Sequence, residues 1–383
     1  MPDDNFPKDD FKELTREELI GEPLTGDDKK FIEEKVEWAA DKLKGAHKEV
    51  GKVIYGQDPL IDLFLADMAA GGNLLAEGVP GLAKTLLVAT LSKVMGLDFQ
   101  RVQFTPDLMP PDIIGTEVQK DEKDRKPGEK PFIFVPGPLF TQFLMADEIN
   151  RTGPRTQAAL LQAMQERKVT VNGHTYYLDN PFITMATQNP LENDGTYPLP
   201  EAQLDRFLIK VPFDYPDRDA EKRIILETTT TTTQAVRDLF NRIGNGEDLR
   251  KPENYRRVEQ HQKVEAILGT QDLIAMQELT RRLPLSEDVV DAILHTVRGA
   301  RPTGDSSEFI QKNVKWGPGP RASQAFALVA KAQALMRGEL SPTIDDIREL
   351  MTPVMEHRMA LKYDARARDV DFAAVLNHLK LKL

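Results

Sequence analysis

The chain has 383 residues, 40% of them hydrophobic and 29% charged, which is typical of globular domains and excludes a disordered chain. It has no cysteine, which excludes a disulfide framework and thiolate metal sites and favours a reducing compartment. The net charge of −11 argues against a broad nucleic-acid-binding surface, because such binding depends on neutralising phosphates. The length favours two or three domains of about 100–200 residues each.

Membrane and export signals are not expected. The first residues are acidic and polar, whereas a signal peptide needs a basic start followed by an apolar run. The most apolar stretch, residues 60–91, is interrupted by charged side chains and cannot be an apolar span of about 20 residues. The six histidines lie far apart and lack metal-ligand spacing. A cytoplasmic protein is therefore expected.

The chain begins with an acidic arm, residues 1–24, and a helix is predicted over 25–50. Apolar residues recur there at alternating spacings of four and three, which places them on one helix face: Ile32, Val36, Ala39, Leu43, Ala46 and Val50. A coiled-coil partner is an alternative, but packing within the helix's own domain is favoured because the pattern covers fewer than three heptads.

Residues 51–227 alternate short apolar runs with helical patterns, as a parallel βαβ sheet requires. Two segments interrupt this pattern: a charged, proline-bearing insert at about 106–140, and a β-hairpin over 168–178 that turns at Asn172-Gly173. The strands are predicted at 73–77, 99–104, 143–146, 182–187 and 207–213.

A polar segment follows at 228–269 and begins with six threonines, which are typical of a solvated connector. The remainder, residues 270–383, is predicted to be a small α-helical domain. Its clearest helical patterns are at 289–297, 322–335, 344–351 and 372–379.

A glycine-rich loop stands between the first predicted strand and a helix, which is the context of a phosphate-binding loop. Glycines let backbone N–H groups approach phosphates, Lys84 would contact the β- and γ-phosphates, and the Thr85 hydroxyl would reach Mg²⁺. Ala83 departs from the consensus glycine, but it is small enough to keep the loop close. The predicted nucleotide-binding residues here are Gly78, Val79, Pro80, Gly81, Leu82, Ala83, Lys84, Thr85 and Leu86.

Two carboxylates, Asp147 and Glu148, directly follow the buried strand 143–146. Ligands of open α/β sheets bind at this carboxyl end of the strands. We expect Asp147 to hold Mg²⁺ and Glu148 to orient and polarise the attacking water. Asn189 follows the next strand, where a carboxamide can position both the γ-phosphate and the water; as an isolated residue it would be read as part of a turn before Pro190.

The strings GVPGLAKT, ADEINRT, ATQNP, LPEAQLDRF and GPGPRAS, in this order, resemble the MoxR family of AAA+ ATPases. The resemblance covers most of 51–215 and 283–367. It implies a P-loop AAA+ α/β domain, a helical lid, ATP and Mg²⁺ as cofactors, and ATP hydrolysis. It also implies that the insert is a helix-2 insert and that the hairpin precedes the sensor-1 strand.

The resemblance also implies roles for individual residues. Asn189 matches sensor 1, Arg206 matches the arginine finger that acts on a neighbouring subunit, and Arg321 matches sensor 2 in the lid. With Glu148 they form the expected catalytic set. Gly56 and Gln57 resemble the turn that packs near the adenine.

Partners are implied in the same way: a hexameric ring, a von Willebrand factor A-domain protein, and a protein client that the ATPase remodels or matures, in some cases by metal-cofactor insertion. The extra N-terminal segment and the long segment 228–269 depart from the family pattern. Arg151 and Arg155 stay open as alternative fingers. A ring motor acting on nucleic acid is the alternative function, and the net charge of −11 counts against it.

Overall fold

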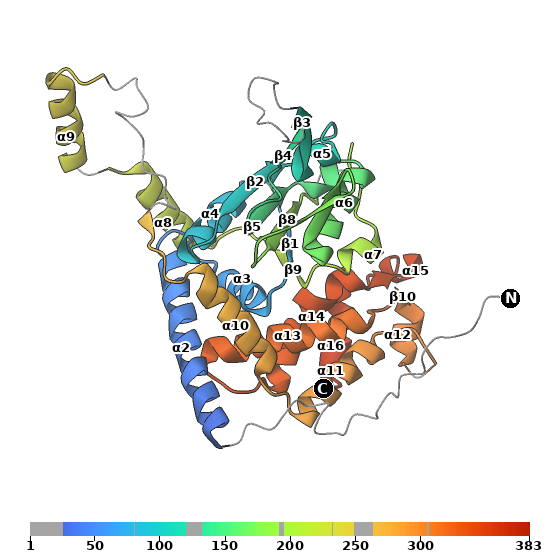
Figure 1. Ribbon diagram of the computed structural model, residues 1–383. Coiled ribbons are helices and arrows are strands. Elements are labelled where there is room, and N and C mark those ends of the chain that lie inside the picture. The colour runs from blue at the N-terminus through green and yellow to red at the C-terminus, as the bar shows by residue number, and fades with distance from the viewer. Residues whose placement is uncertain are drawn as a thin grey trace.

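The computed structural model describes residues 26–79, 81–119, 132–190, 195–231, 233–248, 263–304 and 306–383. Its centre is a five-stranded sheet in the order β2, β5, β8, β1, β9, with every neighbouring pair parallel (Figure 1). The predicted parallel sheet is confirmed. Strand β9 begins two residues later than predicted, at 209 and not at 207. The strands are β1 (Leu74–Glu77), β2 (Phe99–Gln103), β5 (Phe143–Asp147), β8 (Ile183–Gln188) and β9 (Ile209–Pro212).

Both faces of this sheet are covered, because its central strands are apolar on both sides. Side chains alternate between two hydrophobic cores: Leu74 and Ala76 belong to one, and Leu75 between them belongs to the other. Helix α6 (Pro154–Glu166) packs in the second core through Leu160. The first core contains residues of α2 (Gly26–Val50), α3 (Asp58–Ala70) and α4 (Lys84–Val94).

Helix α2 matches the predicted N-terminal helix. All six of its predicted inward positions are buried, and the helix packs against α13, α3 and α4 of the same chain. Packing within the chain, the favoured alternative, therefore accounts for its apolar face.

The predicted helical domain is confirmed, with one addition: a short antiparallel pair, β10 (Val314–Trp316) and β11 (Ala360–Leu361). The segment Glu356–Arg358, which follows α14, is the 3-10 helix η4. Side chains of Ser286, Ser307 and Thr343 cap helix N-termini. The helices are α10 (Thr270–Arg282), α11 (Glu287–Gly299), α12 (Glu308–Asn313), α13 (Pro320–Arg337), α14 (Ile344–Met355), α15 (Tyr363–Arg366) and α16 (Phe372–Lys380).

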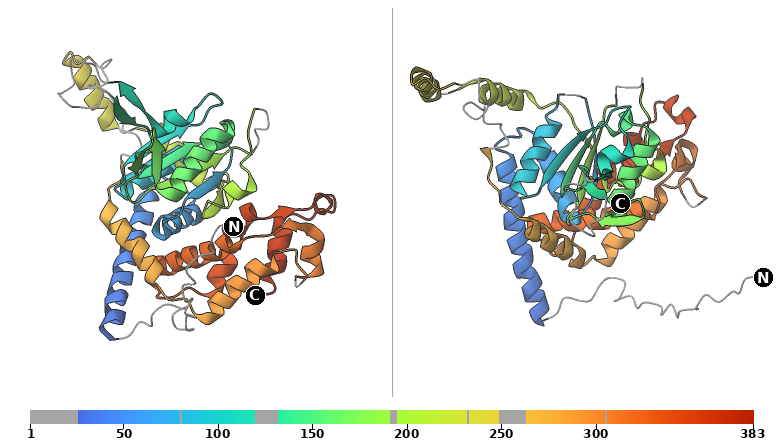
Figure 2. Two further views of the ribbon diagram at one scale, coloured as in Figure 1. Left: turned by 45° about the vertical axis from the view of Figure 1, so that its right-hand side comes forward. Right: turned by 45° about the horizontal axis from the view of Figure 1, so that its top comes forward.

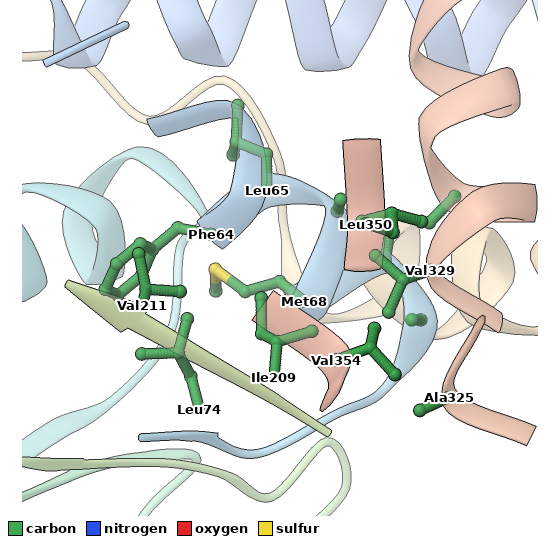
Figure 3. Close-up of a cluster of buried hydrophobic side chains, with 14 of the residues drawn as sticks. Phe64, Leu65, Met68, Leu74, Ile209, Val211, Ala325, Val329, Leu350 and Val354 are labelled. Carbon is green, nitrogen blue, oxygen red and sulfur yellow. The ribbon is translucent and has the colours of Figure 1, made fainter. Parts of the chain in front are cut away.

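Helix α3 lies between the sheet and the helical domain (Figure 3). Phe64 and Met68 lie beside sheet residues such as Ile209, and Met68 is also close to Val354 of α14. Nine of the thirteen residues of α3 are buried, which is expected for a helix with apolar neighbours on several sides. This helix therefore joins the two domains through a shared core.

The predicted insert consists, where it is described, of α5 (Pro110–Ile114) and a two-stranded ribbon, β3 (Gly115–Gln119) and β4 (Phe132–Pro136). The predicted hairpin is β6 (Lys168–Val171) and β7 (His174–Tyr177). The two ribbons touch: the rings of Phe134 and Tyr176 stack at 4.0 Å, and Asn172 donates a hydrogen bond to Glu117. The charged tip, 120–131, lies outside the described residues, as do the arm 1–24 and residues 249–262.

The threonine run connects two helices: Thr228 and Thr229 end α8 (Arg218–Thr229), and Thr233 begins α9 (Thr233–Gly244). The hydroxyl of Thr228 donates to the carbonyl of Ile224 at 2.7 Å. Such bonding back to the previous turn keeps a threonine within a helix. Helix α9 extends away from the rest of the molecule in both figures (Figure 1, Figure 2).

Candidate active site

The glycine-rich loop joins β1 to α4, as predicted. A Cβ at Gly78 would lie 2.7 Å from Cβ of Phe213, so only glycine fits there. Gly81 has φ +88°, a left-handed conformation that glycine adopts without strain. Ala83 has φ +57° at the N-cap of α4, which explains why glycine is the usual residue and why a small side chain is the tolerated departure. Pro80 lies outside the described residues.

This loop borders a cavity of about 480 Å³ at the carboxyl ends of the strands. Most predicted nucleotide-binding residues line it, together with the acidic pair and Asn189, while Val79 packs against the first core. The lining residues are Gly78, Gly81, Leu82, Ala83, Lys84, Thr85, Leu86, Arg101, Gln103, Asp147, Glu148, Thr187, Gln188 and Asn189.

Gly56 and Gln57 line a second, smaller cavity of about 260 Å³. Leu60, Val211 and Tyr215 line it as well, so its walls are largely apolar. A flat aromatic group fits walls of this kind better than a phosphate does.

Lys84 is the cation of the loop. Its ammonium group donates to the carbonyl of Gly78 and lies 5.9 Å from the ring centroid of Phe213. Burial lowers the pKa of Lys84, while the nearby carboxylates of Asp147, Glu148 and Glu77 counteract this effect. The carboxylates thus help to keep a half-buried ammonium group charged.

The acidic pair is held by a residue of the neighbouring strand. The Thr187 hydroxyl donates to Asp147 Oδ1 at 2.6 Å and accepts from the backbone N–H of Glu148 at 2.8 Å. Glu148 has φ +58°, a conformation that is uncommon outside glycine and recurs at functional sites. The sequence indicates Thr187 only as the end of a predicted strand, because a contact between β5 and β8 depends on the strand order.

Two further cavity residues, Arg101 and Gln103, are missed by the sequence prediction. Arg101 Nη2 lies 2.6 Å from Asp147 Oδ2, and Gln103 Nε2 donates to Glu148 Oε2 at 2.5 Å. Their spacing could have revealed them: the two residues are two positions apart in a predicted strand, so their side chains point to the same face of the sheet. Only the pairing of β2 with β5 brings them to the acidic pair.

The predicted arginines do not line this cavity. Arg151 Nε lies 3.1 Å from Glu148 Oε2 of its own chain, and Arg155 is exposed. Arg206 follows α7 (Glu201–Leu204) and is half-buried; its Nε has no hydrogen-bond partner among the described residues. Arg321, at the start of α13, lies 3.7 Å from Asp205. The structure therefore places Arg206 and Arg321 in one region, apart from the phosphate loop.

The segment that carries Arg206 is fastened to the helical domain by Arg358. This buried guanidinium donates to Asp205 Oδ1 at 2.9 Å and to the carbonyl of Leu208 at 3.1 Å. Burial lowers the pKa of Arg358 to about 10, although Asp205 raises it. Five guanidinium donors suit such a site, where several backbone carbonyls converge.

A second ion-pair group connects the phosphate loop to the helical domain. Lys210 of β9 lies 2.5 Å from Glu77, the residue before the loop, and 3.3 Å from Glu356 of η4. Burial by itself would lower the pKa of Lys210, but the two carboxylates outweigh it and raise the pKa.

The donor set fits Mg²⁺ with a nucleotide phosphate. Mg²⁺ prefers oxygen ligands and usually takes one or two carboxylates, with phosphate and water completing its shell. Thr85 and Asp147 both line the cavity and offer such oxygens, and Lys84 and the N-terminus of α4 offer positive charge to phosphate. Within the described part of the chain, no three His, Cys, Asp or Glu side chains form a metal-binding group.

No helix in the described ranges has the length and apolar character that crossing a membrane requires.

The fold and the site together define an AAA-type ATPase with a helical lid. The family model "ATPase family associated with various cellular activities (AAA)" matches residues 73–209, and the AAA lid domain matches 307–379. The chain belongs to the MoxR family of these ATPases: it is 38% identical over 338 residues to Chaperone MoxR1 of Mycobacterium tuberculosis, covering 88% of this chain and 80% of that one.

Other similar proteins support the same family membership. Protein MoxR of Paracoccus denitrificans is 27% identical over 335 residues, with 85% of this chain and 90% of that protein covered. The crystal structure of a candidate ATPase from Cytophaga hutchinsonii has a TM-score of 0.77 and 36% identity, and covers 94% of this chain and 99% of its own. As a member of this family, the chain is an ATP-hydrolysing enzyme.

Proposed function

We propose that the chain hydrolyses Mg-ATP in the 480 Å³ cavity and uses the energy to remodel or mature a protein client. The observation that carries the first part is the convergence of Lys84, Asp147, Glu148 and Asn189 on one cavity at the start of α4. Lys84 binds the β- and γ-phosphates, while Thr85 and Asp147 hold Mg²⁺. The metal, when bound, neutralises the charge that develops on the phosphates.

Glu148 and Asn189 act on the water. Glu148 accepts a proton from it or polarises it, and the buried carboxamide of Asn189 orients it against the γ-phosphate. The hydrogen bond from the backbone N–H of Glu148 to the Thr187 hydroxyl sets the starting position of that carboxylate. Gly56 and Gln57 border the adenine, which the apolar second cavity suits.

Arg206 and Arg321 act on the nucleotide of a neighbouring subunit in a hexameric ring. Their position apart from the chain's own phosphate loop supports this role, because an arginine that acts in trans must face outward from its own site. Arg151 is a weaker candidate, since it pairs with Glu148 of its own chain.

A chaperone role is supported by the relative named Chaperone MoxR1. The insert ribbon offers a surface for a client: Val118, Ile133 and Val135 lie on one face of it and are each more than 40% exposed. A von Willebrand factor A-domain partner, metal-cofactor insertion in the client and a cytoplasmic location belong to the same proposal, and the family resemblance supports them.

The test combines turnover with client capture. The wild type should release phosphate from ATP only with Mg²⁺, and Glu148→Gln loaded with Mg-ATP should be hexameric by light scattering and retain proteins that Lys84→Ala does not retain. Salt-sensitive DNA binding without such retention would favour the nucleic-acid motor. Failure of the wild type to release phosphate would refute the ATPase assignment of this cavity.

A further inference from the structure

The carboxylate expected to hold Mg²⁺ already has a cationic partner. Asp147 Oδ2 receives two hydrogen bonds from Arg101, at 2.6 Å from Nη2 and 3.1 Å from Nε. Asp147 Oδ1 accepts from Thr187, so both carboxylate oxygens are engaged. The Arg101 guanidinium lines the same cavity as Thr85, the other predicted metal ligand.

The same guanidinium is linked to the water-positioning carboxylate. Arg101 Nη2 also donates to Gln103 Oε1 at 2.9 Å, and the amide group of Gln103 donates to Glu148 Oε2 at 2.5 Å. A continuous chain of bonds therefore runs from Asp147 through Arg101 and Gln103 to Glu148. Neither side chain is needed for the fold's core, because both project from an edge strand into the cavity.

The side chains of Asp147 and Arg101 differ in how freely they can move. The side chain of Asp147 is 14% exposed, at the end of a central strand, whereas that of Arg101 is 44% exposed. An arginine side chain can turn toward solvent without disturbing packing, but the aspartate cannot follow it. If a competing cation takes the place of the guanidinium, Arg101 is the group that leaves.

On the basis of the proposed function, we propose that Arg101 occupies Asp147 in the absence of metal and is exchanged for Mg²⁺ when the nucleotide is loaded.

The exchange follows from charge. A guanidinium and Mg²⁺ compete for the same oxygen of Asp147. The divalent ion binds this oxygen more strongly than the guanidinium does once a phosphate is also a ligand of the ion. The exchange lowers the metal affinity, since the Arg101–Asp147 pair must be broken first. Removing the arginine should therefore raise the affinity for Mg²⁺.

The experiment measures Mg²⁺ binding and not turnover. Mg²⁺ is titrated calorimetrically into the full chain saturated with ADP, for the wild type, Arg101→Met and a matched control, Arg348→Met. Arg348 forms an exposed pair with Asp345 at the same 2.6 Å, with 41% of its side chain exposed, and neither residue lines the cavity. Arg101→Met should lower the Kd for Mg²⁺ roughly two- to fivefold, the range expected for loss of a partly exposed ion pair.

Each outcome decides the matter. Unchanged Mg²⁺ affinity in Arg101→Met would show that the pair does not compete with the metal. A weaker affinity would show that Arg101 prepares Asp147 for the metal, which is the opposite role. An equal gain in Arg348→Met would assign the effect to net charge. A wild type that binds no Mg-ADP would refute the proposed function itself, and thermal melts without metal identify variants that fail to fold.

Discussion

At the scale of single residues, Lys84 is the one lysine among the residues that line the 480 Å³ cavity. Lys84→Ala should lower ATP affinity by roughly 10²-fold or more, as expected when a charge that pairs with a buried opposite charge is truncated. Calorimetric titration with ATP measures this. An affinity within a few-fold of the wild type would show that the phosphates bind elsewhere.

Glu148→Gln separates binding from chemistry. The variant keeps the shape of the side chain but cannot accept a proton, so ATP should bind normally while hydrolysis slows by roughly 10²–10⁴. Phosphate release under saturating Mg-ATP gives the rate. Normal turnover would mean that another group activates the water.

His357 gives a pH-dependent test. Its ring is buried against the Phe207 carbonyl at 3.3 Å, and burial, with a contribution from Arg358, lowers the pKa of His357 well below its usual range. Below about pH 6.5 the unfolded chain protonates this residue and the folded chain does not, so folding stability falls by up to about 1.4 kcal/mol per pH unit. Above that pH both states are neutral and the effect vanishes.

Buried Asp67 opposes this trend, because burial raises its pKa well above the usual range and acid therefore favours its folded form. The comparison is consequently made against His357→Gln, in urea, at pH 7.5 and 5.5. The wild type should lose more stability than the variant on acidification. Equal losses would mean that His357 is protonated in the folded state.

At the scale of elements, helix α3 is the shared core of the two domains. Met68 is 1% exposed and lies among Leu74, Ile209 and Val354, from strands β1 and β9 and helix α14 (Figure 3). Met68→Ala should therefore lower the free energy of unfolding by about 2–5 kcal/mol, the range for truncating a buried side chain.

Urea unfolding measures this change, and Met109→Ala is the control, since Met109 is 61% exposed. A loss below about 1 kcal/mol at Met68 would show that the interface adapts to the cavity. A single transition for both domains is expected, because both bury residues in one cluster.

At the scale of the whole molecule, the ring model depends on Arg206. Arg206→Ala should keep ATP binding and lose turnover by roughly 10³–10⁵, the effect of an arginine supplied in trans. Mixing it with Lys84→Ala should restore activity, since an intact phosphate loop on one subunit can then meet an intact arginine from the other.

Complementation requires subunits that exchange, so a labelled-subunit assay comes first. If subunits exchange and no mixture recovers activity, Arg206 is not the trans-acting group. Arg155 is then the next candidate, because it is exposed while Arg151 pairs with Glu148.

The sequence by itself determined the elements and the reacting groups. Apolar periodicity located the five parallel strands, and local spacing identified Lys84, Thr85, Asp147 and Glu148, because a phosphate loop and an acidic strand end are each contiguous in the chain. The sequence placed all six threonines in a connector, whereas Thr228 and Thr229 end α8 and Thr233 begins α9, because the low helix propensity of threonine does not prevent it from ending or starting a helix.

Only the tertiary structure decided which residues meet. Arg101 and Gln103 reach the acidic pair because β2 lies beside β5, although more than 40 residues separate them in the chain. The same holds for Asp205, where Arg321 and Arg358 converge from the lid. The order of the strands and the docking of the two domains depend on burying whole faces of the sheet and of the helices, and no local sequence pattern encodes this. Because these steps bring distant segments together, they decide which charged groups become partners.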